Sequence, residues 1–114
     1  MANTFKVATK AGVTSSDVIY TVACSTTTVV IGLVLGNTTG SQVTATVSLV
    51  SDTANRTNAN DEVNQTVELI TNAPIPSGSS LSPLDGKIVM ETTDNITVSA
   101  SGAVDVILSI MEIT

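Results

Sequence analysis

A run of aliphatic side chains that is apolar on both faces constrains the fold of this chain most. Residues 26–37 read TTTVVIGLVLGN, and between Val29 and Leu35 only Gly32 is not a large aliphatic residue. Such a run suits a membrane span, a buried central strand, or a strand whose outer face meets another copy of the protein. The run is far shorter than the roughly 20 residues that a membrane helix needs. The two interpretations as a strand therefore remain.

The composition favours a sheet over helices throughout the chain. Hydrophobic residues make up 42% of the sequence, but aromatic residues only 2%, namely Phe5 and Tyr20. The core must therefore consist of Val, Ile, Leu and Ala. Thr, Val and Ile dominate the chain, and these β-branched residues fit a pleated sheet better than a helix. The length of 114 residues fits one domain over residues 1–114.

Short runs of strand-forming residues recur along the chain, with Gly, Asn, Asp, Ser and Pro between them. The clearest alternation is in residues 42–50, where Val43, Ala45, Val47 and Leu49 share one face. This regular spacing predicts an all-β fold, a single antiparallel β-sandwich of jelly-roll-like type with about eight strands. The predicted strands cover residues 4–9, 17–23, 27–35, 42–50, 63–71, 87–91, 96–98 and 104–113.

Residue types that carry catalysis or bind metals are scarce. The chain has no histidine, so neither a hydrolytic triad nor a histidine zinc site is expected. The carboxylates Asp85, Glu91, Asp94 and Asp105 have almost no aromatic residues beside them to bind a sugar, and Asp85 and Asp94 suit turns. We therefore expect a protein that is not an enzyme and has no cofactor. Cys24 lies in an apolar run, and we expect it to be a small buried hydrophobic residue.

The charge balance argues against two classes of partner. The net charge is −6, and Lys6, Lys10, Arg56 and Lys87 are the only basic side chains. Nucleic-acid binding needs a basic surface, and anionic membranes also attract basic segments. We therefore expect no nucleic acid and no membrane among the partners. Residues 1–12 contain no apolar stretch, so we expect no signal peptide.

The predicted last strand is also apolar on both faces. Its even-numbered residues from Val104 to Ile110 suit an inward face, but the other face also carries aliphatic residues. In the predicted third strand, an inward face with Ile31, Leu33 and Leu35 would turn Val30 and Val34 outward. Either loops and termini cover these outward residues, or they form a subunit interface. We favour the interface, and hence an oligomer, because a chain this short has little polypeptide to spare for a cover. The candidate interface residues are Val30, Val34, Ile107, Met111 and Ile113.

The segment SDTANRTNANDE, residues 51–62, has no periodicity and is rich in Asn, Asp and Thr. It predicts a long exposed loop that could recognise a receptor or a neighbouring protein. A calcium site there is less favoured, because the segment lacks the glycine and the carboxylate density of an EF-hand loop. The candidate recognition residues are Asp52, Asn55, Arg56, Asn58, Asp61 and Glu62.

Two long stretches, Thr26 to Val50 and Asn72 to Thr114, resemble small structural proteins of tailed bacteriophages, especially those of marine cyanobacteria. The shared pattern includes a threonine-rich lead, an apolar strand ending in Asn37, and the segment PIPSGSSL that begins at Pro74. It continues with the Gly-Lys-Ile-Val strand that begins at Gly86, and with the closing strand. The resemblance implies a β-sandwich protein of the virion, assembled in the host cytoplasm and present in many copies.

Three functions follow as hypotheses. The first is a capsid decoration, cement or other accessory subunit that forms a trimer or similar ring and contacts other virion proteins, such as the major capsid or tail proteins. The second is a tail, baseplate or fibre component that attaches to the host through residues 51–62. The third is a calcium-dependent carbohydrate-binding module outside the phage context.

Overall fold

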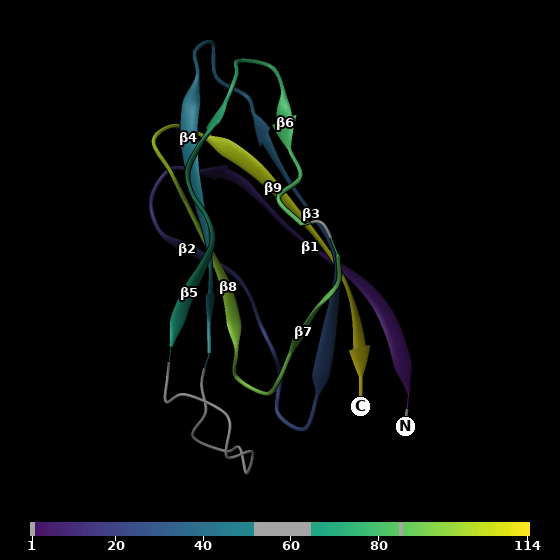
Figure 1. The fold of residues 1–114 in the computed structure, drawn as a ribbon. Helices are drawn as coiled ribbons and strands as arrows, with labels where there is room; N and C mark the ends of the chain where they lie inside the picture. Colours follow the sequence, from purple (N-terminus) through teal and green to yellow (C-terminus); the bar gives the residue numbers. More distant parts are fainter. Residues whose placement is uncertain (1, 52–64, 85) are drawn as a thin grey trace.

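The structure, a computed structural model, describes residues 2–51, 65–84 and 86–114. In these residues the secondary structure consists of nine strands and no helix, arranged in two layers (Figure 1). The molecule is elongated, with extents of 46 × 28 × 22 Å. The strands are β1 (Asn3–Val13), β2 (Asp17–Thr21), β3 (Thr27–Asn37), β4 (Val43–Val50), β5 (Thr66–Ile75), β6 (Ser80–Leu81), β7 (Ile88–Met90), β8 (Asn95–Ala100) and β9 (Val104–Ile113).

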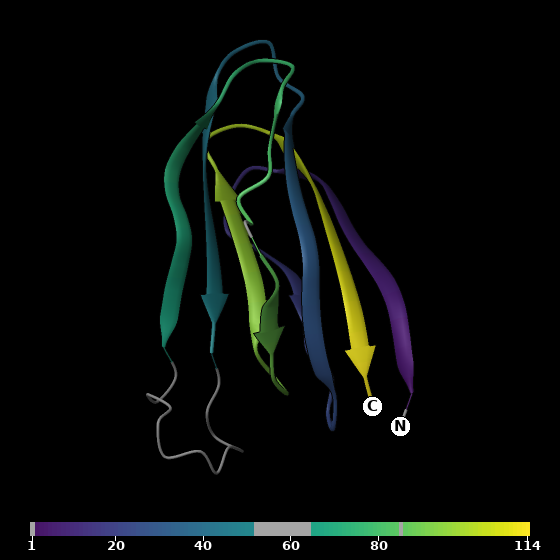
Figure 2. The ribbon, with the colours of Figure 1, turned by 45° about the vertical axis from the view of Figure 1, so that its right-hand side comes forward.

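The strands form two antiparallel sheets that face each other (Figure 2). Sheet A has the order β1-β9-β3-β6, and β7 also pairs with β3; sheet B has the order β2-β8-β4-β5. The pairs are nested along the chain: β1 with β9, β2 with β8, β3 with β6 and β7, and β4 with β5. This is a long antiparallel ribbon rolled across two sheets, which is a jelly roll. The predicted sandwich is confirmed, with β6 and β7 as two pieces of one of its eight strands.

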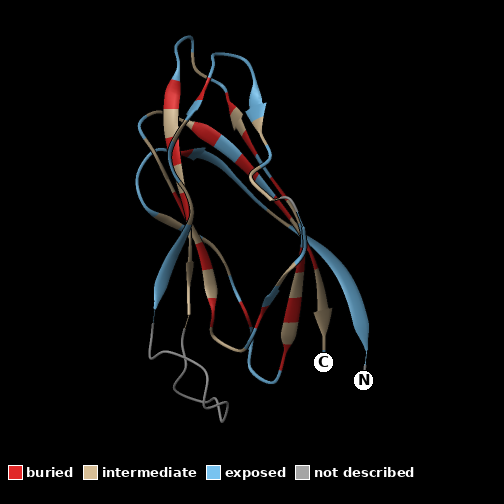
Figure 3. Cartoon of the chain, in the orientation of Figure 1, coloured by how far each residue is buried: buried red, intermediate tan, exposed pale blue. Residues whose placement is uncertain are grey.

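The core follows from the alternation of apolar and polar residues. In β4, Val43, Ala45 and Val47 are buried and the intervening threonines are partly exposed. In β9, the even-numbered residues from Val104 to Ile110 are buried in the same way. Figure 3 shows the buried residues running along β3, β4, β8 and β9, whereas β1 is exposed over nearly its whole length. The core is aliphatic, as the composition predicts.

A β-bulge in β3 corrects the predicted orientation of two residues. The pairing of β3 with β9 slips between Val30 and Gly32, so Ile31 has no partner in the register. As a result Val30 is fully buried and Ile31 is 41% exposed, the reverse of the prediction. Beyond the bulge Leu33 is buried and Val34 faces outward, as predicted. A bulge inserts one residue and so exchanges the faces on one side of it.

The carboxyl end of β3 is fixed by the amide of Asn37, which is buried. Its Nδ2 donates to the carbonyls of Ser41 and Ile75 at 2.8 and 2.9 Å. Its Oδ1 accepts bonds from the backbone N–H and the hydroxyl of Thr39 at 2.9 and 2.7 Å. The side chain thus closes the β3–β4 turn and ties it to the end of β5, which explains why the apolar run stops at Gly36-Asn37.

Three other predictions differ from the structure or lie outside it. Cys24 is exposed, so the prediction that it is buried is wrong; β2 ends at Thr21 and Cys24 lies in the turn that follows. Strand β5 starts later than predicted and includes Pro74, which is tolerated because β5 is an edge strand. Of the predicted loop, only Ser51 is described; the candidate recognition residues from Asp52 to Glu62 lie outside the described residues.

Candidate subunit interface on sheet A

The outer face of sheet A, the side away from sheet B, carries a broad group of apolar side chains. Strand register sets how they line up. Phe5 of β1 lies opposite Met111 of β9, Met111 lies opposite Val29 of β3, and Val29 lies opposite Val89 of β7. Four neighbouring strands therefore contribute one continuous row of apolar residues. Side chains directly opposite on one face are close enough to pack.

Further apolar residues extend this row along the strands. Ile107 of β9 lies opposite Val34 of β3, and Ile113 lies opposite Thr27 near the chain ends. Val7 lies opposite Ser109, and Ile31 is exposed at the bulge in β3. We call this set the sheet A patch. Its members are Phe5, Val7, Val29, Ile31, Val34, Val89, Ile107, Met111 and Ile113.

The patch is open to solvent in the single chain. Phe5 is 73% exposed and Ile107 is 47% exposed. Met111 and Ile113 are partly exposed at the end of β9. Single exposed hydrophobic residues are ordinary, but contiguous apolar patches mark interaction surfaces. The patch is therefore a candidate interface.

Four of the five predicted interface residues lie together in the patch: Val34, Ile107, Met111 and Ile113. Val30 does not, because the bulge places it in the core. Sequence analysis missed Phe5, Val7, Val29, Ile31 and Val89. The alternation of Phe5 and Val7 with Lys6 and Ala8 was a usable signal, but it does not reveal that β1 lies beside β9.

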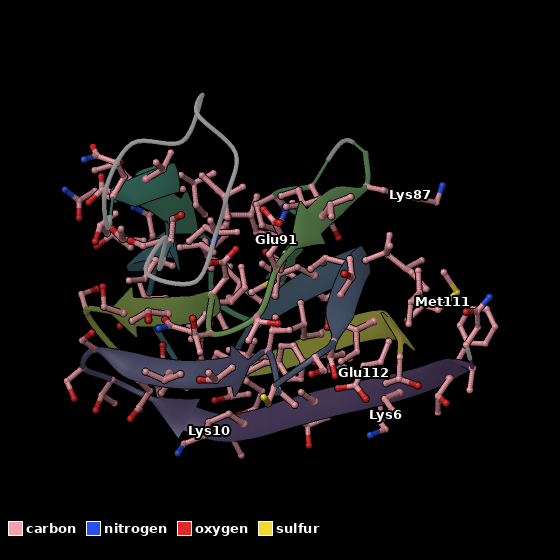
Figure 4. All side chains as sticks on the ribbon, turned by 90° about the horizontal axis from the view of Figure 1, so that it is seen from below. Lys6, Lys10, Lys87, Glu91, Met111 and Glu112 are labelled. Atoms are coloured by element: carbon pink, nitrogen blue, oxygen red, sulfur yellow. The ribbon has the colours of Figure 1, made fainter. Side chains whose placement is uncertain are left out.

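A polar cluster on the inner side of sheet A lies behind one end of the patch. Lys6 Nζ is 2.7 Å from Glu112 Oε1, and the Tyr20 hydroxyl donates to Glu112 Oε2 at 2.5 Å. The Tyr20 oxygen also lies 2.8 Å from Thr28 Oγ1. Figure 4 shows Lys6 and Glu112 pointing toward one another, whereas Lys10 points away. Because Tyr20 belongs to β2 and the others to β1, β3 and β9, the cluster ties the two sheets together.

The cluster shifts two pKa values in opposite directions. Burial, and then the hydrogen bond to Glu112, raise the pKa of Tyr20 to about 12. Hydrogen bonds from Lys6, and then from Tyr20, lower the pKa of the Glu112 carboxyl below its usual value. Both shifts favour a neutral phenol beside a charged carboxylate. We call this cluster a clamp, because its polar groups bond one another and thereby hold the two sheets together.

The outer face of sheet B has a different character. Thr46 lies opposite Ser99 and Ser48 lies opposite Thr97, which gives a surface of hydroxyl groups. Val18 of β2, opposite Thr97, is exposed on this face at 53%. The two outer faces of the sandwich are thus unlike, and among the described residues only the face of sheet A offers a broad apolar surface.

The described residues contain no group of three or more His, Cys, Asp or Glu side chains placed to hold a metal ion. The segment considered for calcium, with Asp52, Asp61 and Glu62, is not among them. The calcium-dependent and host-attachment hypotheses therefore stay predictions. Within the same described ranges, no helix has the length and apolar character needed to cross a membrane.

Comparisons with known proteins add little to this geometry. No family model matches the sequence, and no curated protein matches it. One solved structure matches the fold at 16% sequence identity and a TM-score of 0.47, over 96% of this chain and 85% of the other. It comes from work titled "Bacillus endospore appendages form a novel family of disulfide-linked pili". A similarity this distant carries no functional conclusion.

Proposed function

We propose that the protein is a non-enzymatic structural subunit of a bacteriophage virion, a capsid decoration or accessory protein that assembles with copies of itself through the sheet A patch. The single observation that carries the assembly is the apolar row across β1, β9, β3 and β7 on an outer sheet face. The phage context rests on the resemblance of residues 26–50 and 72–114 to virion proteins.

Copies of the same chain are a suitable occupant of the patch. An apolar contact needs no complementary charge. In a ring, one part of the patch on each subunit packs against a different part of the patch on the next subunit, and these repeated contacts close when the rotation between subunits allows it. The apolar side chains of these four neighbouring strands then leave water and pack against one another, which stabilises the assembly. The acidic character of the chain also disfavours adhesion to packaged DNA.

The test of assembly uses one substitution in the patch and one outside it. Ile107→Asp places an unpaired charge in the proposed contact, which is costly once water is excluded. Analytical ultracentrifugation should show a lower mass for the variant than for the wild-type chain, because the variant loses the contact that closes a trimer or similar ring. Circular dichroism should show an unchanged sheet signal, because Ile107 points away from the core.

Val18→Asp is the matched control. Val18 is exposed to a similar degree as Ile107, but on the outer face of sheet B. This variant should keep the wild-type mass. A wild-type chain that stays monomeric at high concentration, or an equal loss of mass in both variants, would contradict assembly through the sheet A patch.

The location on the particle needs a separate test. Antibody or gold labelling of purified virions, followed by electron microscopy, should place label at many regularly spaced positions on the head. Label confined to the tail tip would favour the host-attachment hypothesis instead. Virions without label would contradict a role in the particle.

A further inference from the structure

The outer edge of β1 is the longest open strand edge in the described part of the molecule. β1 has eleven residues and pairs with β9 on one side only. The other edges are short or irregular. β2 has five residues, β6 two and β7 three, and β5 pairs with β4 through two irregularities and contains Pro74. By contrast, β1 pairs with β9 without interruption from Asn3 to Lys10.

The register shows which backbone groups face this open edge. Ala2 and Thr114 exchange both backbone hydrogen bonds, at 3.2 and 3.0 Å. Hydrogen-bonded pairs alternate along an antiparallel ladder, so the even-numbered residues of β1 bond β9. Phe5, Val7 and Thr9 therefore direct their N–H and C=O groups toward the open edge. The side chains of Phe5 and Val7 belong to the sheet A patch, so edge and patch adjoin.

The central part of this edge has little protection against pairing. Natural proteins guard open edges with charged side chains, especially lysine. Lys6 occupies the right position, but its ammonium is held 2.7 Å from Glu112 Oε1 on the inner side of the sheet. Lys10 points into solvent near the far end of the regular pairing (Figure 4). The stretch from Phe5 to Thr9 is left without an available charge.

We propose that β1 pairs with β1 of a second copy in antiparallel orientation, with Val7 opposite Val7. The register follows from the edge geometry. Pairs must join residues whose backbone groups both face the edge or both face away from it. A register centred on Lys6 would set two lysines directly opposite one another, which is destabilising. A register centred on Val7 places Lys6 opposite Ala8 and Lys10 opposite Thr4.

This contact goes beyond assembly through the sheet face. It is two-fold symmetric and joins two copies of sheet A into one continuous sheet. The two-fold axis stands perpendicular to the sheet, so both patches lie on the same side and merge into a wider apolar surface. Edge pairing and face packing use different groups, namely the backbone of β1 and the side chains of the patch, so each can be removed alone.

Cysteine cross-linking in a Cys24→Ser chain tests the register. The Val7→Cys variant brings two thiols to the two-fold axis, where the Cα separation of about 5.5 Å suits a disulfide. The Thr9→Cys variant is the matched control, because each Thr9 lies opposite Phe5 and the two copies of Thr9 are roughly 13 Å apart. Mild oxidation should give a covalent dimer of the Val7→Cys chain on non-reducing gels, and a monomer of the Thr9→Cys chain. Equal cross-linking of both variants, or none in either, overturns the proposal.

Val7→Pro tests the edge by mass. It removes an N–H that points away from β9, so the β1–β9 ladder stays intact and the side chain stays apolar. The measured mass should fall by half relative to the wild-type chain, and an unchanged mass overturns the proposal. Should this variant fail to fold, the cross-linking result decides. The Ile107→Asp change should leave cross-linking at Val7 intact, so failure of face packing and failure of edge pairing are distinguishable.

Discussion

The buried side-chain amide of Asn37 marks the end of β3, although the apolar pattern of this strand contains no signal for a strand end. Its two donors and its acceptor are all used, by the carbonyls of Ser41 and Ile75 and by the N–H and hydroxyl of Thr39. The amide thereby connects the β3–β4 turn with β5 of the opposite sheet. A carboxylate of the same shape would keep the acceptor and lose both donors.

Asn37→Asp should therefore destabilise the fold by about 2–4 kcal/mol, because a buried charge would face two carbonyl oxygens. The melting temperature should fall by roughly 10 °C or more. Asn95→Asp is the matched control, because Asn95 Oδ1 accepts a bond from Thr97 that a carboxylate also accepts. Calorimetry of the two variants at neutral pH separates them, and similar melting temperatures would contradict the role given to Asn37.

At the scale of the elements, the cluster of Tyr20, Glu112, Lys6 and Thr28 links β2 of one sheet to three strands of the other. Its raised Tyr20 pKa means that the folded state prefers the neutral phenol. The resulting stabilisation is complete below the ordinary tyrosine pKa of 10.0 and is lost as the pH rises toward about 12. The lowered Glu112 pKa acts at the other end, where stability is lost as the pH falls below the usual carboxyl range.

Tyr20 is the only tyrosine and the chain has no tryptophan, so its ionisation is directly visible in the ultraviolet. The phenolate band should appear with a midpoint near pH 12 in the native chain. In a Glu112→Gln chain the midpoint should be lower, because the neighbouring negative charge is gone. A native midpoint near the ordinary value of 10.0 would contradict the clamp between the sheets.

Sequence patterns predict some features of the strands and miss others. The boundaries of β9 and the alternation of β4 are predictable, because one face of each is consistently apolar and turn residues flank them. The bulge at Ile31 is not predictable, because Val29 to Leu35 is apolar on both faces and a one-residue slip leaves no trace in the pattern. The exposure of Cys24 is not predictable for a similar reason. Its apolar neighbours in the sequence indicate a strand, but β2 ends at Thr21, before Cys24.

At the scale of the whole molecule, the jelly roll was predictable as a class, from the number and spacing of short strands. The patch was predictable only in part. Strands that are apolar on both faces indicate Ile107, Met111 and Val34, but Phe5 and Val89 join them only through the strand order of sheet A. That order depends on pairings between distant segments, which no local pattern specifies. The consequence is that side chains from both ends of the chain share one surface.

The mutual hydrogen bonds of Ala2 and Thr114 have a consequence for how the chain could be rewired. A short peptide joining these two positions, with a new opening at the exposed turn near Ser15, would give a circular permutant in which β9 and β1 become a hairpin. The most distant pairing in the molecule would then be local, which lowers contact order, so we expect refolding to accelerate. Stopped-flow refolding of the permutant and the natural chain would measure the difference. Equal refolding rates would mean that the pairing of the first and last strands does not limit the folding rate of the jelly roll.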